Sequence, residues 1–524
     1  MEKVETIKDL GRLLKKNLVF FLILAVTIVI AYGNLANGEF LNLDDNTGII
    51  YNQDLRNFEG TVKKLSLGPI YAATIIKLFG VTPSAFHVGS IIFHIIDTIL
   101  IFVLAYLLIG KRGAVVTSLL FALHPVNSET VGWISSRGYL INSIFIFTTL
   151  ISFVIYKNSK NKKFLYASMG IFALNLLSMR DPWSLITPFI IVALDQFVFE
   201  KKIEWKNIKF YIPYAIVSVA FVMLNVVPEL QSRVEVLETK HYLDVEGATP
   251  LLNRIPYTIA MATRLLVFPL RLSIYHEGKV ITSFNYAMMV LTAIAVVWAI
   301  IKLIKKERML AGFGMIIFLS MLPSFSPILI AWSIAERYLY IASAFFSMIV
   351  AVLIFRAEKK TDMKDLTAVL VTIILIFYSV RTILRTNDLK NSKNLWYATM
   401  KTAPYSYRVY NNLGDVYANE GNYDLAIENF KKSVALRPNY ADAIHNIGFS
   451  YLQKGDLEKA KQYLLQSYKM NPLLYQAAYK LGFISYKEGN LQEAKTYFEQ
   501  CLQLAPGNAD CTVALQTTTQ ALGN

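Results

Sequence analysis

The sequence is poor in cysteine and in charged residues. Only two of its 524 residues are cysteine, Cys501 and Cys511, and they show neither a disulfide framework nor the spacing of a zinc site. Charged residues make up 17% of the chain, whereas soluble domains contain about 25%. Most of the chain is therefore not an ordinary soluble protein.

Short motifs that identify common enzyme classes are also absent. No P-loop, GxSxG, HExxH or CxxC sequence occurs, which excludes the usual nucleotide-binding, hydrolase and redox classes. His87 and His94 lie seven residues apart on one helical face. A metal site would need a third ligand, and none is evident, so we expect structural histidines and no metal.

Long apolar runs are what the sequence has in excess. Hydrophobic residues make up 55% of the chain, and the mean hydropathy is +0.42. Apolar stretches of about 18 residues or more recur up to residue 385, and this length crosses about 30 Å of hydrocarbon. They predict about eleven membrane spans, at residues 18–36, 86–108, 113–123, 138–156, 164–178, 184–199, 209–227, 284–304, 309–329, 337–356 and 365–384.

The loops between these runs alternate in charge. The chain carries 52 basic and 37 acidic residues, a net charge of +15. The basic residues gather in six short segments, which the positive-inside rule places in the cytoplasm, and this distribution argues against a nucleic-acid partner. The six are the N-terminal tail, 111–112, 157–163, 200–209, 302–308 and 356–364. Eleven crossings then place the C-terminal region on the non-cytoplasmic side.

Two apolar segments need separate treatment. Leu18 to Ile30 lacks a clear signal-peptidase site and precedes a long polytopic region, so we expect an uncleaved first span. Ile255 to Leu270 would break the charge alternation if it crossed the membrane. With Arg254, Arg264 and Arg271 it suits a re-entrant or interfacial helix.

From about Tyr405 the sequence repeats every 34 residues. Each unit has an apolar residue followed by glycine, then a second glycine, an alanine, a large apolar residue and a proline. In the first unit these are Leu413-Gly414, Gly421, Ala426, Phe430 and Pro438. The second glycine allows a tight turn, the alanine allows close packing, and the proline ends the second helix. The pattern predicts TPR-type helical hairpins that stack into an α-solenoid.

Stacked hairpins of this kind form a concave groove that suits an extended peptide or a partner helix. We expect partner binding there through Asn412, Tyr417, Asn446 and Tyr451, and an inert spacer is the alternative. Cys501 occupies the position that holds serine in the other repeats, which predicts a small helix-packing residue.

Four polar clusters lie on the predicted non-cytoplasmic side. The first is Asp44-Asp45, after the first span. Adjacent carboxylates repel, so one pKa rises in a partly buried site and that group can accept a proton near neutrality. A solvated turn is the alternative.

The second cluster runs from His124 to Arg137 and contains Glu129 and Trp133. A cation, an acid and an aromatic ring at a membrane surface suit a phosphate and a sugar, and an interfacial aromatic anchor is the alternative. The other two clusters are Arg180-Asp181-Pro182-Trp183 and Ala335 to Tyr340.

In order along the chain, these clusters resemble the TMTC-type proteins, which are transmembrane and TPR-repeat-containing protein O-mannosyltransferases of the GT-C glycosyltransferase class. The resemblance covers nearly the whole chain, and FALHPVNSETVGWISSRGYL is its most specific segment. The segments that carry it are Asp44-Asp45, Phe86 to His94, Phe121 to Leu140, Phe268 to Ser273, Ala335 to Tyr340 and the TPR array.

The resemblance implies a membrane glycosyltransferase that moves a monosaccharide, expected to be mannose, from a polyprenyl-phosphate donor to protein Ser/Thr hydroxyls with inversion. One carboxylate of Asp44-Asp45 would be the general base. Arg137 and Arg337 would neutralise the phosphate, and Glu129 and Glu336 would orient these arginines or contact the sugar. The expected donor-binding set is His124, Glu129, Arg137, Arg180, Asp181, Glu336 and Arg337.

The chain departs from the family pattern in two places. Arg180-Asp181 replaces the usual Lys-Glu, which keeps both charges and shortens the acid. Leu67-Gly68-Pro69-Ile70 stands where the family often has Arg-Pro-Leu, so a donor contact by that arginine is missing.

Two other function classes compete with this interpretation. A non-catalytic membrane-anchored TPR scaffold that binds envelope proteins would not need polar clusters gathered on one side. A lipid-linked sugar transporter needs polar groups at mid-membrane depth, and only His87, His94 and Asp97 are candidates.

The sequence thus predicts an all-α integral membrane protein, which we expect in a bacterial plasma membrane. Residues 1–385 would form a polytopic GT-C-like catalytic domain, and 386–404 a half-repeat junction. Residues 405–524 would form a TPR domain of three repeats and a C-terminal cap on the non-cytoplasmic side.

Overall fold

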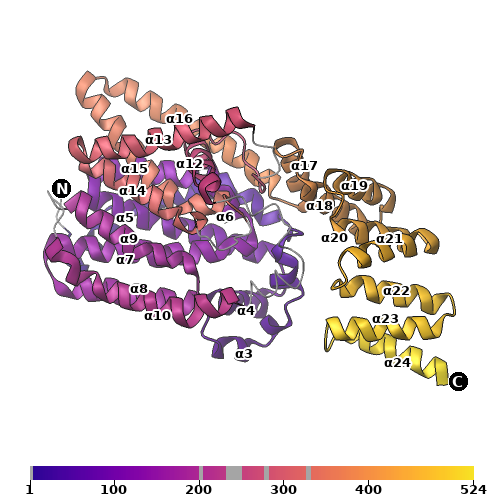
Figure 1. Cartoon of the computed structure of the whole chain (residues 1–524). Coiled ribbons are helices and arrows are strands. Elements are labelled where there is room, and N and C mark those ends of the chain that lie inside the picture. The colour runs from indigo at the N-terminus through magenta and orange to yellow at the C-terminus, as the bar shows by residue number, and fades with distance from the viewer. Residues whose placement is uncertain (1–3, 200–204, 232–250, 277–281, 326–331, 524) are drawn as a thin grey trace. The chain divides into compact units, whose positions relative to one another are not determined.

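The computed structural model of the chain describes residues 4–199, 205–231, 251–276, 282–325 and 332–523. Every regular element among these residues is a helix, which confirms the all-α prediction. The chain forms two compact units (Figure 1). Of the described residues, the second unit contains those from Trp396 on together with Gln231, Tyr275 and His276, and the first unit contains the rest.

Eight helices in the described ranges are long and apolar enough to cross a membrane. They cover nine of the eleven predicted spans, because one 41-residue helix contains both 86–108 and 113–123. The eight are Leu18–Asn37, Pro83–Leu123, Ile134–Ser159, Pro182–Phe199, Ile212–Gln231, Ser283–Lys306, Glu336–Thr361 and Lys364–Asp388.

The two remaining predicted spans also fall on helices. Span 164–178 lies in α8 (Lys162–Met179), and span 309–329 begins in the shorter α14 (Arg308–Ser320) and runs beyond the described residues. The chain is therefore an integral membrane protein with eight candidate membrane helices, and the total of eleven spans stays a prediction.

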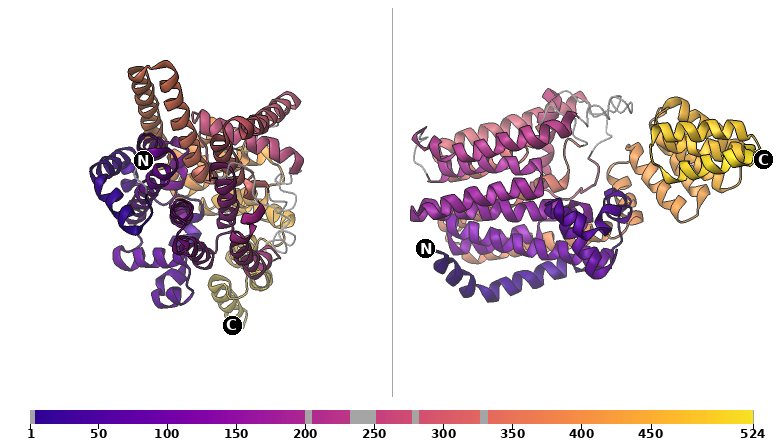
Figure 2. Two further views of the ribbon diagram at one scale, coloured as in Figure 1. Left: turned by 90° about the vertical axis from the view of Figure 1, so that its left-hand side faces the viewer. Right: turned by 90° about the horizontal axis from the view of Figure 1, so that it is seen from below.

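The long helices of the first unit lie side by side (Figures 1 and 2). α5, α7 and α15 are mostly buried among their neighbours, whereas α13 and α16 expose most of their apolar length. In a bilayer, such exposed apolar faces contact lipid. The bounds are α1 Ile7–Lys16, α2 Leu18–Tyr32, α3 Phe58–Lys63, α4 Leu67–Phe79, α5 Pro83–Leu123, α7 Arg137–Ser159, α9 Thr187–Ala193, α10 Ile212–Phe221, α12 Leu251–Val267, α13 Ser283–Lys306, α15 Tyr340–Thr361 and α16 Lys364–Asp388.

A single glycine divides α5 into two helical pieces. Gly110 has φ 82° and ψ 175°, a conformation that only glycine adopts without strain. The break separates the two predicted spans 86–108 and 113–123, and the basic pair Lys111-Arg112 follows it directly. The positive charges of these two residues predict a cytoplasmic turn at this position.

The α12 helix is not one of the eight candidate membrane helices. Its Ala262, Leu265 and Leu266 are buried in a hydrophobic cluster with Leu272 and Leu339, among others. The opposite side of the helix is exposed. The re-entrant or interfacial location of this segment stays a prediction.

The second unit is a stack of helical hairpins, as the 34-residue period predicts. Gly421, Gly455 and Gly489 have φ values of 76°, 81° and 80° and form the turns within the hairpins. The helices are α18 Tyr407–Asn419, α19 Tyr423–Leu436, α20 Ala441–Gln453, α21 Leu457–Met470, α22 Tyr475–Lys487, α23 Leu491–Leu504 and α24 Ala509–Gly523. Ahead of them, α17 (Ser392–Thr402) carries the fully buried Trp396.

The two cysteines form a disulfide, so the prediction that Cys501 only fills space is wrong. Cys501 in α23 is bonded to Cys511 in α24, with 6.1 Å between their Cα atoms. Both side chains are buried. The ten-residue separation hid the pair from the sequence analysis because one helix turn and a proline-glycine turn bring the residues together in space.

The first glycine of each repeat lies where the two helices of a hairpin pack closely against each other. A methyl group at Gly448 would lie 2.8 Å from Leu464 Cγ, 3.0 Å from Leu464 N and 3.2 Å from Ala460 O, so backbone atoms would have to move. At Gly414 only the Phe430 ring is in the way. We expect Gly448→Ala to destabilise its hairpin by about 1–3 kcal/mol, and more than Gly414→Ala does. Proteolysis of the array in urea measures both, and equal effects would contradict this packing argument.

Candidate active site

The Asp44-Asp45 loop follows the first span and is fixed at several points. The Glu39 amide donates to Lys390 O at 2.8 Å, and the Asn42 amide donates to Ser392 Oγ at 2.8 Å. The loop therefore lies against the end of α16 and the turn that follows it, which are more than 340 residues away in sequence.

The two aspartates of this loop have different environments. Asp45 is fully buried. Its Oδ2 accepts from the Leu41 amide at 2.9 Å, and its Oδ1 accepts from the Ser135 amide at 2.9 Å and from Ser135 Oγ at 2.5 Å. Burial raises the pKa of the Asp45 carboxyl, and these hydrogen bonds and the charge of Arg137 oppose the rise. Asp44 is exposed.

The segment from His124 to Arg137 is almost entirely buried. It folds as three short helical turns, Pro125–Asn127, Ser128–Gly132 and Ile134–Ser136. Ser136 Oγ donates to Trp133 O at 2.7 Å and to Thr130 O at 2.8 Å, so the turns are closed on each other. The segment places Ser135 against Asp45 and Glu129 in the interior.

Two buried ion pairs meet at Glu129 and Glu336. Glu129 pairs with Arg337, and Glu129 Oε2 also accepts from the Glu336 amide at 3.1 Å. Glu336 pairs with Arg385 Nη2 at 3.2 Å and accepts from the Ser273 amide. All four charged side chains are at most 8% exposed. Burial raises the pKa of Glu129, and the Arg337 charge opposes the rise.

Aromatic rings enclose the arginine of the first pair. The Arg337 guanidinium lies 4.8 Å from the centroid of the Trp133 ring and 4.9 Å from that of Tyr338. These contacts compensate part of the cost of burying the cation. Arg137 is placed differently: its Nη1 donates to Ile134 O at 3.0 Å, and its guanidinium lies 5.5 Å from the Phe86 ring.

His124 is a neutral structural histidine. Its Nε2 lies 3.1 Å from Leu266 O, and its Nδ1 accepts from the Val126 amide at 3.3 Å. Burial lowers its pKa to about 4, so the ring is uncharged at neutral pH. The contact with Leu266 ties this segment to α12.

Arg180 and Asp181 have different environments: the side chain of Arg180 is exposed, and that of Asp181 points toward neighbouring helices. Arg180 is exposed and donates from Nη2 to Lys64 O at 3.2 Å. Asp181 accepts from the Trp183 amide at 3.0 Å and from Asn142 Nδ2 at 3.1 Å, and burial raises its pKa to about 6. Asp181 thereby positions Trp183 and Asn142.

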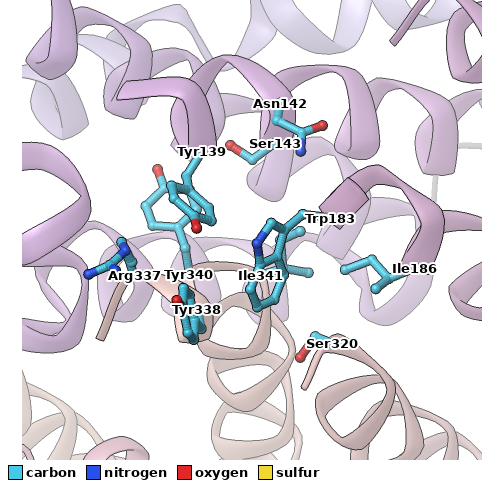
Figure 3. A pocket seen from close by; sticks show the side chains of 10 residues that line it. All are labelled: Tyr139, Asn142, Ser143, Trp183, Ile186, Ser320, Arg337, Tyr338, Tyr340 and Ile341. Carbon is cyan, nitrogen blue, oxygen red and sulfur yellow. The ribbon is translucent and has the colours of Figure 1, made fainter. Parts of the chain in front are cut away.

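Trp183 and Asn142 line a pocket with an aromatic wall (Figure 3). The ring centroids of Trp183 and Tyr338 are 4.6 Å apart, and those of Trp183 and Tyr139 are 5.8 Å apart. Arg337 is also part of the lining, so the pocket adjoins the Glu129 ion pair. The lining residues are Tyr139, Asn142, Ser143, Trp183, Ile186, Ser320, Arg337, Tyr338, Tyr340 and Ile341.

A chain of buried polar groups that the sequence analysis did not connect lies beneath this pocket. His94 Nδ1 is 2.7 Å from Tyr340 Oη, and Tyr340 Oη donates to Asp97 Oδ2 at 3.1 Å. Ser143 Oγ donates to the same Asp97 oxygen at 2.6 Å. The sequence places Asp97 in the middle of a predicted span. It does not predict the hydrogen bond between Asp97 and Tyr340, because 243 residues separate them.

His87 and His94 do not share a metal-like environment. His94 is bonded within the polar chain, whereas the buried His87 faces the backbone of Glu39 and does not belong to that chain. Within the described ranges, no group of three or more His, Cys, Asp or Glu side chains is placed to hold a metal ion.

The four predicted groove residues all make contacts within the second unit. Asn412 Nδ2 donates to Tyr275 Oη at 3.1 Å, and Asn446 Nδ2 donates to Asp415 Oδ1 at 3.1 Å. The Tyr417 hydroxyl bonds to that of Tyr397, and the Tyr451 ring is stacked on Tyr463 with centroids 5.7 Å apart. These contacts place the asparagines on the inner helices of adjacent hairpins.

Fold and site together define a class of polytopic membrane proteins that carry a tetratricopeptide-repeat array. Residues 405–472 and 475–508 match family models described as tetratricopeptide repeat. Several solved structures of TPR proteins each cover about a quarter of this chain. The crystal structure of MamA protein is 23% identical over 25% of this chain and 72% of that chain, with a TM-score of 0.23. The Arabidopsis OM64 TPR domain is 17% identical over 22% and 96%, with a TM-score of 0.22.

Curated relatives extend the similarity into the membrane unit. The human protein O-mannosyl-transferase TMTC3 is 22% identical over 68% of this chain and 43% of the relative. The Caenorhabditis elegans protein O-mannosyl-transferase F38B6.6 is 24% identical over 78% of this chain and 59% of the relative. Mouse TMTC4 is 20% identical over 78% and 65%. The chain is thus a distant homologue of the TMTC protein O-mannosyltransferases, and it spans about half the length of the first two.

The buried ion pair predicts the effect of removing Glu129. Glu129→Gln leaves the Arg337 charge buried without its counter-charge, so we expect a loss of about 3–5 kcal/mol of unfolding free energy. The matched control is Glu358→Gln, which breaks a pair with the 70% exposed Arg112 and should cost less than about 1 kcal/mol. Thermal unfolding in detergent compares the two. Similar losses in both variants would show that the inner pair has no special role.

Asp415 predicts a pH dependence of the repeat array. Burial raises its pKa to about 7, and Asp442 adds to the rise. The unfolded chain therefore ionises Asp415 first, and its stability contribution falls between about pH 4 and pH 7, by at most about 1.4 kcal/mol per pH unit. Asp415→Asn should remove this slope and be more resistant to proteolysis than wild type at pH 8. A wild type that is equally resistant at both ends of this range would contradict the assignment.

Proposed function

We propose that the protein is a membrane glycosyltransferase that moves a monosaccharide, mannose by homology, from a polyprenyl-phosphate donor to Ser/Thr hydroxyls of proteins. The homology to O-mannosyltransferases supports the enzyme class. The observation that carries the proposal is the pairing of an exposed carboxylate, Asp44, with a buried neighbour, Asp45, whose two oxygens are both hydrogen-bonded.

The two aspartates have separate roles in this proposal. A general base must reach the hydroxyl proton that it removes. Asp45 is enclosed and already accepts three hydrogen bonds, so it anchors the loop to Ser135. Asp44 directly precedes Asp45 and has an exposed side chain, so we assign the role of general base to Asp44.

The reaction is a single displacement. Asp44 accepts the proton of the acceptor hydroxyl, and the hydroxyl oxygen forms a bond to the anomeric carbon of the donor sugar. The bond from that carbon to the phosphate oxygen breaks, and the electron pair leaves with the lipid phosphate. Attack opposite to the leaving group inverts the anomeric configuration, as in inverting glycosidases, which use one carboxylate as base.

The predicted donor-binding residues take different parts in this scheme. Arg337 is already neutralised by Glu129, so Arg137 is the better placed cation for charge that develops near Asp45. Glu129 and Glu336 hold arginines in place. Asp181 positions Trp183 and Asn142 through its hydrogen bonds. His124 and Arg180 each contact a backbone carbonyl oxygen and have a structural role.

The TPR groove would present acceptor peptides. Disulfides persist in oxidising compartments, so the Cys501–Cys511 bond supports a non-cytoplasmic location of the array. This agrees with the location that the loop charges predict. The buried Trp396 of α17 supports the proposal that residues 386–404 form a half-repeat at the junction.

The separate roles predict separate effects of substitution. Asp44→Asn should lower sugar transfer about 10²–10⁴-fold without changing thermal stability, because only the base is lost. Asp45→Asn keeps one acceptor oxygen and should lower both the stability of the loop and transfer. Transfer of labelled mannose in membranes and thermal unfolding measure these effects. Full transfer by Asp44→Asn, with loss only in Asp45→Asn, would reverse the assignment.

A further inference from the structure

The polar side chains beneath the aromatic pocket have no part in the proposed reaction. His94 and Asp97 are fully buried in α5, a candidate membrane helix. His94 Nδ1 lies 2.7 Å from Tyr340 Oη, and this oxygen lies 3.1 Å from Asp97 Oδ2. Ser143 Oγ lies 2.6 Å from the same Asp97 oxygen. Because Tyr340 and Ser143 also line the pocket (Figure 3), these contacts connect the pocket to the interior of α5.

The surroundings of this group are apolar. Within the described ranges, no cation forms an ion pair with Asp97, and its Oδ1 has no hydrogen-bond partner. Three aromatic rings surround His94, with centroid distances of 5.1 Å to Tyr32, 5.4 Å to Phe121 and 5.8 Å to Tyr340. A charge in such an interior is costly. The placement of the protons therefore decides what the group can do.

One ring nitrogen of His94 must carry a proton. Its Nε2 lies 3.1 Å from Ala122 O, and a carbonyl oxygen accepts hydrogen bonds but cannot donate one. Nε2 is therefore the donor. A neutral imidazole has a single N–H, so Nδ1 is then an acceptor and needs a donor. The Tyr340 hydroxyl lies in that position.

The remaining protons can be placed in two ways. If Tyr340 donates to Asp97, its one proton is used, so Nδ1 must also donate; His94 is then a cation and Asp97 a carboxylate. If Asp97 keeps a proton, its carboxyl donates to Tyr340, Tyr340 donates to Nδ1, and all three groups are neutral. Both forms contain the same protons. The neutral form becomes the charged form when the Asp97 proton moves to the Tyr340 oxygen and the Tyr340 proton moves to Nδ1.

The contacts favour the neutral form. The charged form buries two opposite charges with a hydroxyl between them, so their attraction is weaker than in the direct Glu129–Arg337 pair, while the desolvation cost remains. The neutral form also leaves no proton without an acceptor. Ser143 Oγ has a second acceptor, Leu140 O at 2.8 Å, and can therefore accept from Asp97.

We propose that His94, Tyr340 and Asp97 form a closed proton relay, in which one proton is shared between Asp97 and His94 through the Tyr340 hydroxyl and rests on Asp97. The relay positions the two pocket hydroxyls, those of Tyr340 and Ser143, without placing a net charge inside the membrane unit. It gives a role to the ionisable groups of α5 that would otherwise suggest a transporter. The relay does not depend on the proposed sugar transfer.

Infrared difference spectroscopy of the full-length protein in nanodiscs at pH 7 tests the relay. A protonated carboxyl has a C=O stretching band that a carboxylate lacks. This band should appear when the spectrum of Asp97→Asn is subtracted from that of wild type. The matched control is Asp195→Asn, because Asp195 is equally buried but pairs directly with Lys157. Its difference spectrum should contain carboxylate bands instead.

Thermal unfolding gives a second readout that separates the two forms. The amide of an asparagine can donate to Tyr340 as the neutral acid does. Asp97→Asn should therefore unfold at about the temperature of wild type, whereas Asp97→Leu, which cannot donate, should unfold at a lower temperature. In the charged form, both variants would leave the His94 cation buried without a counter-charge, and both would be destabilised.

Two results would overturn the proposal. One is a carboxylate band in place of the acid band in the Asp97 difference spectrum. The other is an equal loss of thermal stability in Asp97→Asn and Asp97→Leu. Tyr340→Phe provides an independent measurement, because it keeps the carboxyl and removes the bridge. Its acid band should shift in frequency from that of wild type, and an unchanged acid region would contradict the relay.

Discussion

The polar side of the membrane unit depends on two adjoining buried ion pairs, Glu129 with Arg337 and Glu336 with Arg385. A charge in a membrane protein interior is costly unless a counter-charge lies beside it. Here each carboxylate also accepts a backbone amide, Glu129 from Glu336 and Glu336 from Ser273. Four separate parts of the chain therefore meet at one point.

The two ion pairs also help to position the neighbouring loops. Glu129 belongs to the buried segment that ends at Arg137, and that segment presents Ser135 to Asp45. The loop is thereby held while Asp44 remains exposed. In the other direction, Ser273 connects the pair to the loop that carries Arg271. The loop that carries the proposed base is thus held by the same buried segment that carries Glu129.

The sequence predicted the architecture well because its signals are local. Apolar run length identified the membrane helices, and a five-position repeat identified the hairpins. The polar clusters were also found, since charges stand out in an apolar chain. Roles within them were not predictable: Asp44 and Asp45 are neighbours in sequence, and only the fold shows which one is buried.

Pairings between distant residues were the other missing part. Arg385 directly follows the last predicted span, yet its side chain is fully buried and paired with Glu336. The link between Tyr340, Asp97 and His94 joins two helices, α5 and α15, that are far apart in sequence. The disulfide joins two helices whose packing depends on the repeat geometry. Each of these contacts depends on how helices pack, which the pattern of one helix does not contain.

The proposed activity is the transfer of a sugar from a lipid phosphate to protein hydroxyls. The most direct test is to incubate membranes that contain the wild-type chain with polyprenyl-phosphate mannose labelled in the sugar, and to measure label released from protein by β-elimination. We expect O-linked label with an anomeric configuration opposite to that of the donor. No label with mannose, glucose or N-acetylhexosamine donors would contradict it and favour a non-catalytic TPR scaffold.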